Sequence, residues 1–162
     1  MSRARGNAAT IGDASARPWV VQLAALPAGF GDLAADAKAA GSRILDVLEQ
    51  DWDSGAVRFD RPGEALFGAV NGDALLGILG VTCDPYMRDA AVMRVRRLYV
   101  LRAARCAGLG RQLVEAAAAQ ARSAGAARLR VRAPASAFAF YERCGFLRLV
   151  GEGAATHVLH LG

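Results

Sequence analysis

The first part of the chain combines a short apolar run with two helical patterns. The run that follows Pro18 reads WVVQLAAL and predicts a strand that ends at Pro27. Residues 32–40 are rich in alanine and predict a helix, with Gly41 as its C-cap and Ser42 as the N-cap of a second helix. In that second segment, apolar side chains recur at spacings of three and four, the period of one helix face: Ile44, Leu45, Leu48 and Trp52.

The middle of the chain predicts three consecutive strands and a long helix. Residues 65–70 and 74–82 are apolar runs joined by Asn71-Gly72-Asp73, a strong signal for a β-hairpin. Residues 92–100 predict the third strand. A loop then leads to a helix over 109–124 that Gly125 ends. Its apolar stripe has a spacing of four: Leu109, Leu113, Ala117 and Ala121.

The last part predicts a strand at 129–132, a short helix at 135–144, and two strands at 146–150 and 157–160. The full order is therefore β-α-α-β-β-β-α-β-α-β-β. Residues 1–17 lack hydrophobic periodicity and are interpreted as a flexible leader. The remainder, 18–162, is expected to form a single domain, because 162 residues bury enough surface for one core.

Composition narrows the class of protein. The chain is 54% hydrophobic and 22% charged, which is typical of a globular protein. No apolar run reaches the length of about 18 residues that a membrane span needs, and no signal peptide is visible. The three cysteines, Cys83, Cys106 and Cys144, do not have the spacing of a disulfide framework or a zinc site. These features predict a cytoplasmic protein without a membrane partner.

The net charge is +5, and arginine supplies all but one of the 20 basic residues. Two interpretations stay open: a solvated basic surface, or a site for an anionic ligand. No motif of a nucleic-acid-binding module accompanies the charge, so nucleic acid is not an expected partner. His157 and His160 have odd spacing on one strand and so lie on opposite faces, which disfavours a shared metal site.

Residues 105–110 read RCAGLG between a predicted strand and a predicted helix. Glycines at a helix start let backbone amides approach a ligand, and the free N–H groups favour an anion such as pyrophosphate. A glycine-rich turn without a ligand is the alternative. About thirty residues later, AFAFYERCGF contains Tyr141 and ends at Gly145-Phe146. On its own, this segment favours a buried aromatic cluster followed by a glycine that stops the helix.

Together, these motifs and the preceding Arg97-Leu98-Tyr99-Val100 resemble the GCN5-related N-acetyltransferase (GNAT) family. The resemblance covers residues 93–150 strongly and 77–86 more loosely. It implies an α/β fold with a mixed, mostly antiparallel sheet of six to seven strands, flanked by about four helices. It also implies acetyl-CoA as cosubstrate, without a metal, and an amine of a small molecule, peptide or protein as acceptor.

The resemblance assigns roles to individual residues. In the family, the RxxGxG turn binds the pyrophosphate of coenzyme A, and the preceding strand has a bulge and hydrogen-bonds pantetheine through backbone groups at Leu98, Tyr99 and Val100. Tyr141 matches the tyrosine that protonates the departing thiolate after direct attack of the amine on the thioester. The implied pyrophosphate-binding residues are Arg105, Cys106, Ala107, Gly108, Leu109, Gly110 and Arg111.

Three positions depart from the family pattern. Arg94 occupies the position of a glutamate that acts as general base in many members, which leaves water, Asp84, Asp89 or Glu64 as alternatives, unless the amine arrives already neutral. Asp84, next to Pro85, is more typical of a turn former than of a catalytic residue. Ser136 replaces an asparagine that contacts the cofactor; a serine still offers one hydrogen bond. Cys106 and Ala107 replace basic or glycine residues, so charged contacts to phosphate would come from Arg105, Arg111 or Arg102.

The departures keep other interpretations open. A non-catalytic module that binds acyl-CoA as a sensor is the alternative to an enzyme. Arg94, Arg96 and Arg97 either are solvated or lie in the acceptor cleft, where they would favour a substrate with a carboxylate or phosphate. The apolar terminal strands could also pair across a homodimer.

Overall fold

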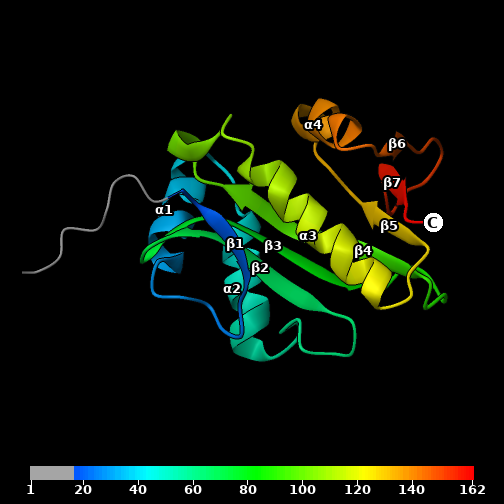
Figure 1. Ribbon diagram of the computed structural model, residues 1–162, viewed down its shortest axis with the longest axis horizontal. Coiled ribbons are helices and arrows are strands. Elements are labelled where there is room, and N and C mark those ends of the chain that lie inside the picture. The colour runs from blue at the N-terminus through cyan, green and yellow to red at the C-terminus, as the bar shows by residue number, and fades with distance from the viewer. Residues whose placement is uncertain (1–16) are drawn as a thin grey trace, which may run out of the picture.

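The computed structural model describes residues 17–162 and contains one seven-stranded sheet with helices on both faces (Figure 1). The predicted leader up to residue 16 lies outside the described residues. All neighbouring strands are antiparallel except β4 and β5, which are parallel. The predicted fold class is thus confirmed. In spatial order the strands are β1 (Trp19–Gln22), β2 (Ala65–Asn71), β3 (Ala74–Cys83), β4 (Val92–Val100), β5 (Arg128–Val131), β7 (His157–His160) and β6 (Leu147–Arg148).

Four α-helices cover the sheet, and the predicted order of elements is confirmed. Helices α1 (Phe30–Ala39) and α2 (Ile44–Ser54) pack on one face, while α3 (Leu109–Ser123) and α4 (Phe138–Arg143) contribute to the core on the other. Two short 3₁₀ turns, η1 (Arg102–Ala104) and η2 (Ala135–Ala137), precede α3 and α4. Within residues 17–162, every helix is too short or too polar to cross a bilayer.

Several predicted boundaries differ from the observed ones. The first strand stops at Gln22, where its pairing with β2 ends. The second helix begins at Ile44 with Arg43 at the N-cap position, so the prediction of Ser42 as N-cap is wrong by one residue. The Ser42 hydroxyl nevertheless accepts a hydrogen bond from the Ile44 N–H at 3.4 Å. The predicted helix at 135–144 divides into η2 and α4.

Each face of the sheet has its own hydrophobic core. On the α3 face, the predicted stripe of Leu109, Leu113, Ala117 and Ala121 is fully buried. Its alanines let the helix lie close to the strands. The core on the opposite face is built mainly from α1, α2 and the side chains of β3 that point toward these two helices. Leu33, Leu48 and Ile78 are fully buried in it. The site described below lies along β4, in the middle of the sheet, between the two cores.

The loop between α2 and β2 is fastened to the sheet by one close contact. The Phe59 ring lies directly on Gly80 of β3, where a Cβ would come within 2.2 Å of a ring carbon. Any side chain at this position would therefore displace the ring. Phe59 itself has a φ of 54°, a backbone conformation that is rare for a bulky residue. The contact holds residues 55–61 against the sheet face that carries α1 and α2.

Candidate active site

Strands β4 and β5 pair over only three positions and then separate. Their parallel register runs from Val92↔Arg128 to Arg94↔Arg130. Beyond that point, Val131 pairs with His157 of β7, and within residues 17–162 no strand pairs with β4 on the β5 side. The edge of β4 from Val95 to Val100 therefore has backbone groups available to an extended ligand.

A β-bulge accompanies this separation. Ile78 of β3 pairs with Tyr99, and Gly80 pairs with Arg96, so Leu79 faces two residues of β4 instead of one. Arg97 lies in the bulge with a φ of 57°. A bulge of this kind bends its strand. The bulge that the family resemblance implies is therefore present in the strand where it was expected.

The turn at residues 105–110, called the glycine turn below, exposes its backbone at the start of α3. Cys106 has a φ of 68° and Gly108, the N-cap, has a φ of 81°. No side chain within the described residues caps the helix, and residues 105–108 are exposed. The first N–H groups of α3 thus have no helical acceptor, and together with the helix dipole they favour an anion.

Three arginines surround the glycine turn, each with a different contact. Arg105 donates from Nε to the Val100 carbonyl at 3.0 Å, and its guanidinium lies 5.3 Å from the centre of the Tyr99 ring. Arg102 pairs with Asp36 at 3.3 Å, and Arg111 pairs with Glu115 along α3. All three side chains are exposed, so their guanidinium groups are accessible to an anion bound at the turn.

Asp36 of α1 anchors the segment that leads into the glycine turn, a role that the sequence did not reveal. Its Oδ2 accepts hydrogen bonds from the Tyr99 hydroxyl at 2.7 Å and from the Arg102 N–H at 3.1 Å. The bond from Tyr99 lowers the pKa of Asp36, and burial raises the pKa of Tyr99. The side chain of Tyr99 therefore has a structural partner, while its backbone lies on the open edge of β4.

Tyr141 lies in α4 and is only 4% exposed. Its ring packs edge-on against Phe140 and Phe146, with centroids 5.0 and 5.3 Å away. Burial raises the pKa of Tyr141 well above its ordinary value, so its hydroxyl stays protonated at neutral pH. The Phe140 ring lies 3.1 Å from where a Cβ on Gly110 would be, which joins α4 to the first turn of α3. Tyr141 and the glycine turn thus belong to neighbouring elements.

Ser136 lies in η2, just before α4, and is exposed. His157 of β7 is fully buried behind α4, with Nδ1 2.9 Å from the Thr156 hydroxyl and Nε2 3.2 Å from the Glu142 carboxylate. The contact with His157 lowers the pKa of Glu142. His160 is exposed on the other face. No three residues with metal-ligating side chains cluster within residues 17–162.

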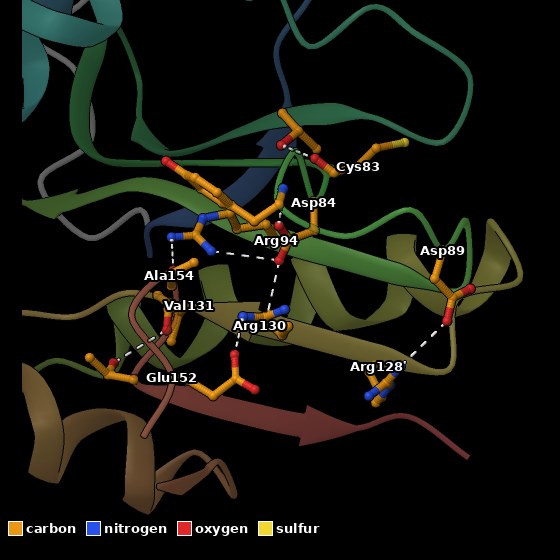
Figure 2. Close-up of polar contacts among 12 residues, drawn as sticks. Cys83, Asp84, Asp89, Arg94, Arg128, Arg130, Val131, Glu152 and Ala154 are labelled. Atoms are coloured by element: carbon orange, nitrogen blue, oxygen red, sulfur yellow. Dashed lines mark hydrogen bonds and ion pairs between the residues drawn. The ribbon is translucent and has the colours of Figure 1, made fainter. Parts of the chain in front are cut away.

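Arg94 belongs to a buried ionic cluster, shown in Figure 2 and called the Asp84 cluster below. Asp84 is completely buried, and its Oδ2 lies 3.6 Å from Arg94 Nη1 and 3.5 Å from Arg130 Nε. Both arginine side chains are less than a tenth exposed. These three atoms have no hydrogen-bond partner in the described part of the chain. Burial lowers the pKa of Arg94.

The remaining contacts of the Asp84 cluster come from the loop between β6 and β7. Arg94 donates to the Ala154 carbonyl at 2.6 Å, and Arg130 pairs with Glu152 at 3.1 Å. Asp84 also forms the turn that its neighbour Pro85 suggested, because its Oδ1 accepts a hydrogen bond from the Tyr86 N–H. The cluster therefore joins the turn after β3, strands β4 and β5, and a distant loop at the point where β4 and β5 separate.

The other carboxylates that the sequence offered as bases lie elsewhere. Asp89 is exposed and pairs with Arg128 at the closed end of β4 and β5. Glu64 accepts a hydrogen bond from the Cys83 N–H at 3.2 Å. Of the three carboxylates, only Asp84 lies beside Arg94, and it is held between two arginines.

The open strand edge, the bulge and the exposed helix start all lie within residues 62–148, which match a family model for the acetyltransferase (GNAT) domain. The match covers more than half of the chain, and the chain belongs to the GNAT family. Among curated protein sequences, none matches it.

Solved structures share the fold. A protein from Exiguobacterium sp. 255-15 that is assigned as an acetyltransferase is 24% identical, with a TM-score of 0.78, over 90% of this chain and 94% of its own. The GNAT family N-acetyltransferase YhbS from Escherichia coli, in complex with CoA, is 19% identical, with a TM-score of 0.67, over 93% and 84% of the two chains. An aminoglycoside 6'-N-acetyltransferase complexed with coenzyme A is 13% identical, with a TM-score of 0.65, over 89% and 97%.

Proposed function

We propose that this protein is an acetyl-CoA-dependent N-acetyltransferase that transfers the acetyl group directly to an amine. The observation that carries the proposal is the open edge of β4, which leads from Arg94 to the glycine turn at the start of α3. Two of the structural neighbours were solved with coenzyme A, which supports a CoA site on this fold. The acceptor is an amine of a small molecule or of a peptide.

The backbone would bind most of the cosubstrate. N–H groups of the glycine turn would hold the pyrophosphate, with Arg102, Arg105 and Arg111 adding charge. Backbone groups at residues 98–100 would align pantetheine as an added strand. A backbone N–H on this edge would polarise the thioester carbonyl, because a fixed dipole stabilises the developing oxyanion. Ser136 offers one further hydrogen bond.

Transfer would then occur by direct attack. The neutral amine forms a C–N bond to the carbonyl carbon, and the C–S bond breaks as the thiolate leaves. Tyr141 would protonate that thiolate, since its hydroxyl carries a proton throughout the neutral pH range. Cys106 and Cys144 have no histidine pair in the described residues, so a covalent acyl-enzyme is disfavoured. With Arg94 in place of a glutamate, the amine would lose its proton to water.

Calorimetry tests the cofactor site directly. Gly108→Glu places a carboxylate on the glycine turn, and Gly125→Glu is its matched control at the other end of α3. Both glycines have positive φ, 81° and 83°, and open space around them, so backbone strain and added charge are equal. We expect Gly108→Glu to abolish binding of acetyl-CoA and CoA, while Gly125→Glu retains it. No binding by folded wild type would sink the transferase proposal.

The alternative is a non-catalytic module that binds acyl-CoA, and Arg94 in place of the usual glutamate is the observation that favours it. Such a module would bind acetyl-CoA normally but would release no CoA with any amine. A thiol-release assay over an amine panel, run after the calorimetry, separates the two functions.

A further inference from the structure

Arg96 is a half-buried arginine on β4 that lines a cavity of about 270 Å³. It projects from the same sheet face as Arg94, because side chains two residues apart on a strand share a face. The cavity lies between β3, β4 and the loop that follows α2, with Arg58, Arg61 and Thr82 also in its wall. We call this cavity the Arg96 pocket.

Arg96 differs from the neighbouring arginines of β4 and β5 because, among the described residues, it forms no ion pair. Arg94 and Arg130 contact Asp84, and Arg97 pairs with Asp51 at 3.4 Å. Within residues 17–162, Arg96 makes neither an ion pair nor a hydrogen bond from its side chain. Burial lowers the pKa of Arg96, the charges of Arg97 and Arg94 lower it further, and the charge of Asp51, which is paired with Arg97, offsets part of this shift. A half-buried cation among like charges costs free energy unless an anion offsets it.

The walls of the Arg96 pocket leave this charge uncompensated. Two carboxylates, Asp60 and Glu64, lie in the wall, but neither forms an ion pair with an arginine in the described part of the chain. Glu64 is already hydrogen-bonded to the Cys83 N–H. Arg58 donates its Nε to the Trp52 carbonyl at 3.0 Å. Three arginines against two carboxylates give the pocket a net positive charge.

The pocket is preformed. The Phe59 ring fastens the loop between Arg58 and Arg61 onto Gly80, and Gly80 is the direct pairing partner of Arg96. Loop and strand are therefore held at a fixed separation, and Arg96 projects between them. A guanidinium in such a place can bind a carboxylate or phosphate with two parallel hydrogen bonds.

The pocket adjoins the place where the proposed reaction would occur. Arg96 is two residues along β4 from Arg94, a Cα separation of roughly 7 Å at the usual rise of a strand. Arg94 marks the position where β4 and β5 separate. The Tyr86 ring, which is 65% exposed, lies 5.0 Å from the Arg94 guanidinium and borders the same face. A small ligand could therefore reach both the thioester and Arg96.

We propose that Arg96 binds an oxyanion of the acceptor, so that the acceptor is a small amine that also carries a carboxylate or a phosphate. This inference rests on the proposed function, since it names the substrate class of the same site. Arg96 would be a specificity-determining residue: it would hold the far end of the acceptor while the amine attacks the acetyl group.

The test compares paired amines. The probes are straight-chain amino acids with two to six carbons, the corresponding amides, and aminoethyl phosphate. Wild type, Arg96→Gln, Arg96→Lys and the control Arg128→Gln are assayed for CoA release. Arg128 lies on the same face of the sheet but at the closed end of β4 and β5, and its exposed pair with Asp89 contributes little.

In wild type, we expect kcat/KM for the best anionic amine to exceed that of its neutral counterpart by about tenfold or more. This is the fold-change that corresponds to the free energy of one hydrogen bond between charged groups. Arg96→Gln should bring that ratio close to one, Arg96→Lys should retain part of it, and Arg128→Gln should retain all of it. The KM for acetyl-CoA should stay unchanged in all four proteins. The carboxylate and phosphate arms identify which oxyanion is preferred.

Equal turnover of neutral and anionic amines by wild type, or an anion preference that survives in Arg96→Gln, overturns the inference. If no probe is acetylated, calorimetry of glutarate and inorganic phosphate with the acetyl-CoA-saturated protein decides it: binding that weakens about tenfold in Arg96→Gln supports it, and no binding overturns it. Failure of wild type to bind acetyl-CoA instead contradicts the proposed function, so the two failures are distinguishable.

Discussion

The glycine turn and the Asp84 cluster lie at opposite ends of the open edge of β4, and they are built by different means. The glycine turn offers backbone N–H groups from consecutive residues, with few side chains involved. At the centre of the Asp84 cluster are three buried side chains from separate segments: Asp84 from the turn after β3, Arg94 from β4 and Arg130 from β5. Backbone groups are offered by any residues that adopt the turn, whereas the cluster depends on the identity of each side chain in it.

The largest expected effect comes from removing the carboxylate of the Asp84 cluster. Asp84→Asn would leave Arg94 buried without a counter-ion, beside Arg130, whose remaining partner is Glu152. Breaking such a buried ionic contact costs about 3–5 kcal/mol of unfolding free energy. Urea denaturation measures this change. Asp89→Asn removes the exposed partner of Arg128 and should cost under about 1 kcal/mol. Equal losses in the two variants would show that the cluster is solvated, and the contrast with the glycine turn would then disappear.

Tyr141→Phe should have the next largest effect, and only on catalysis. Loss of a general acid lowers kcat by about 100-fold or more, while the affinity for acetyl-CoA stays as in wild type.

Because burial raises the pKa of Tyr141, the acid form persists as pH rises, and kcat of wild type should show no loss between pH 8 and about pH 10. The same burial stabilises the neutral form, so folding stability that depends on Tyr141 is lost only above the ordinary tyrosine pKa. An unchanged kcat in the variant would remove Tyr141 from the mechanism.

The order and type of the elements could be predicted because each is encoded locally. The hairpin at Asn71-Gly72, the strand at 92–100 and the alanine stripe of α3 are all visible in short windows of sequence. Helix ends were less predictable. Arg43 rather than Ser42 occupies the N-cap of α2, although the Ser42 hydroxyl still accepts a hydrogen bond from the Ile44 N–H; local sequence fixes a helix end only to within one or two residues.

The residues of the candidate site also divide into those that a local motif predicted and those that only the tertiary structure revealed. The glycine turn was visible because its residues are consecutive, and Tyr141 because it lies in a short motif. Asp36, Arg130 and Glu152 were not, because each contributes one side chain from a remote segment and no local pattern marks it. The interpretation of Asp84 as a turn former was confirmed by its bond to Tyr86, but its second oxygen, buried between two arginines, needed the tertiary structure.

Asp36→Asn should moderately weaken the binding of CoA at the glycine turn. The Asp36 carboxylate holds Tyr99 and the Arg102 N–H, so its loss should raise the Kd for CoA about three- to tenfold without changing the anion preference at Arg96. Because the hydrogen bond from Tyr99 lowers the pKa of Asp36, its stabilisation is present above the ordinary aspartate pKa and lost as pH falls through the lowered value. The difference in Tm between wild type and variant should therefore be full at pH 7 and shrink below about pH 4. A Kd equal to that of wild type would show that the turn needs no side-chain support.

The smallest effect is expected from Glu115→Gln on α3. Glu115 and Arg111 form an exposed pair at 3.3 Å, both about two thirds exposed, and such pairs contribute about 0.5 kcal/mol or less. Removing Glu115 leaves Arg111 unpaired beside the glycine turn and deletes a negative charge near the proposed phosphate site. We therefore expect CoA to bind slightly more tightly, by less than about threefold, with the gain vanishing at high salt because both groups are solvated. Calorimetry at two ionic strengths measures this. Weaker binding would mean that Glu115 orients Arg111 toward phosphate. Side-chain geometry would then matter at the glycine turn as much as it does in the Asp84 cluster.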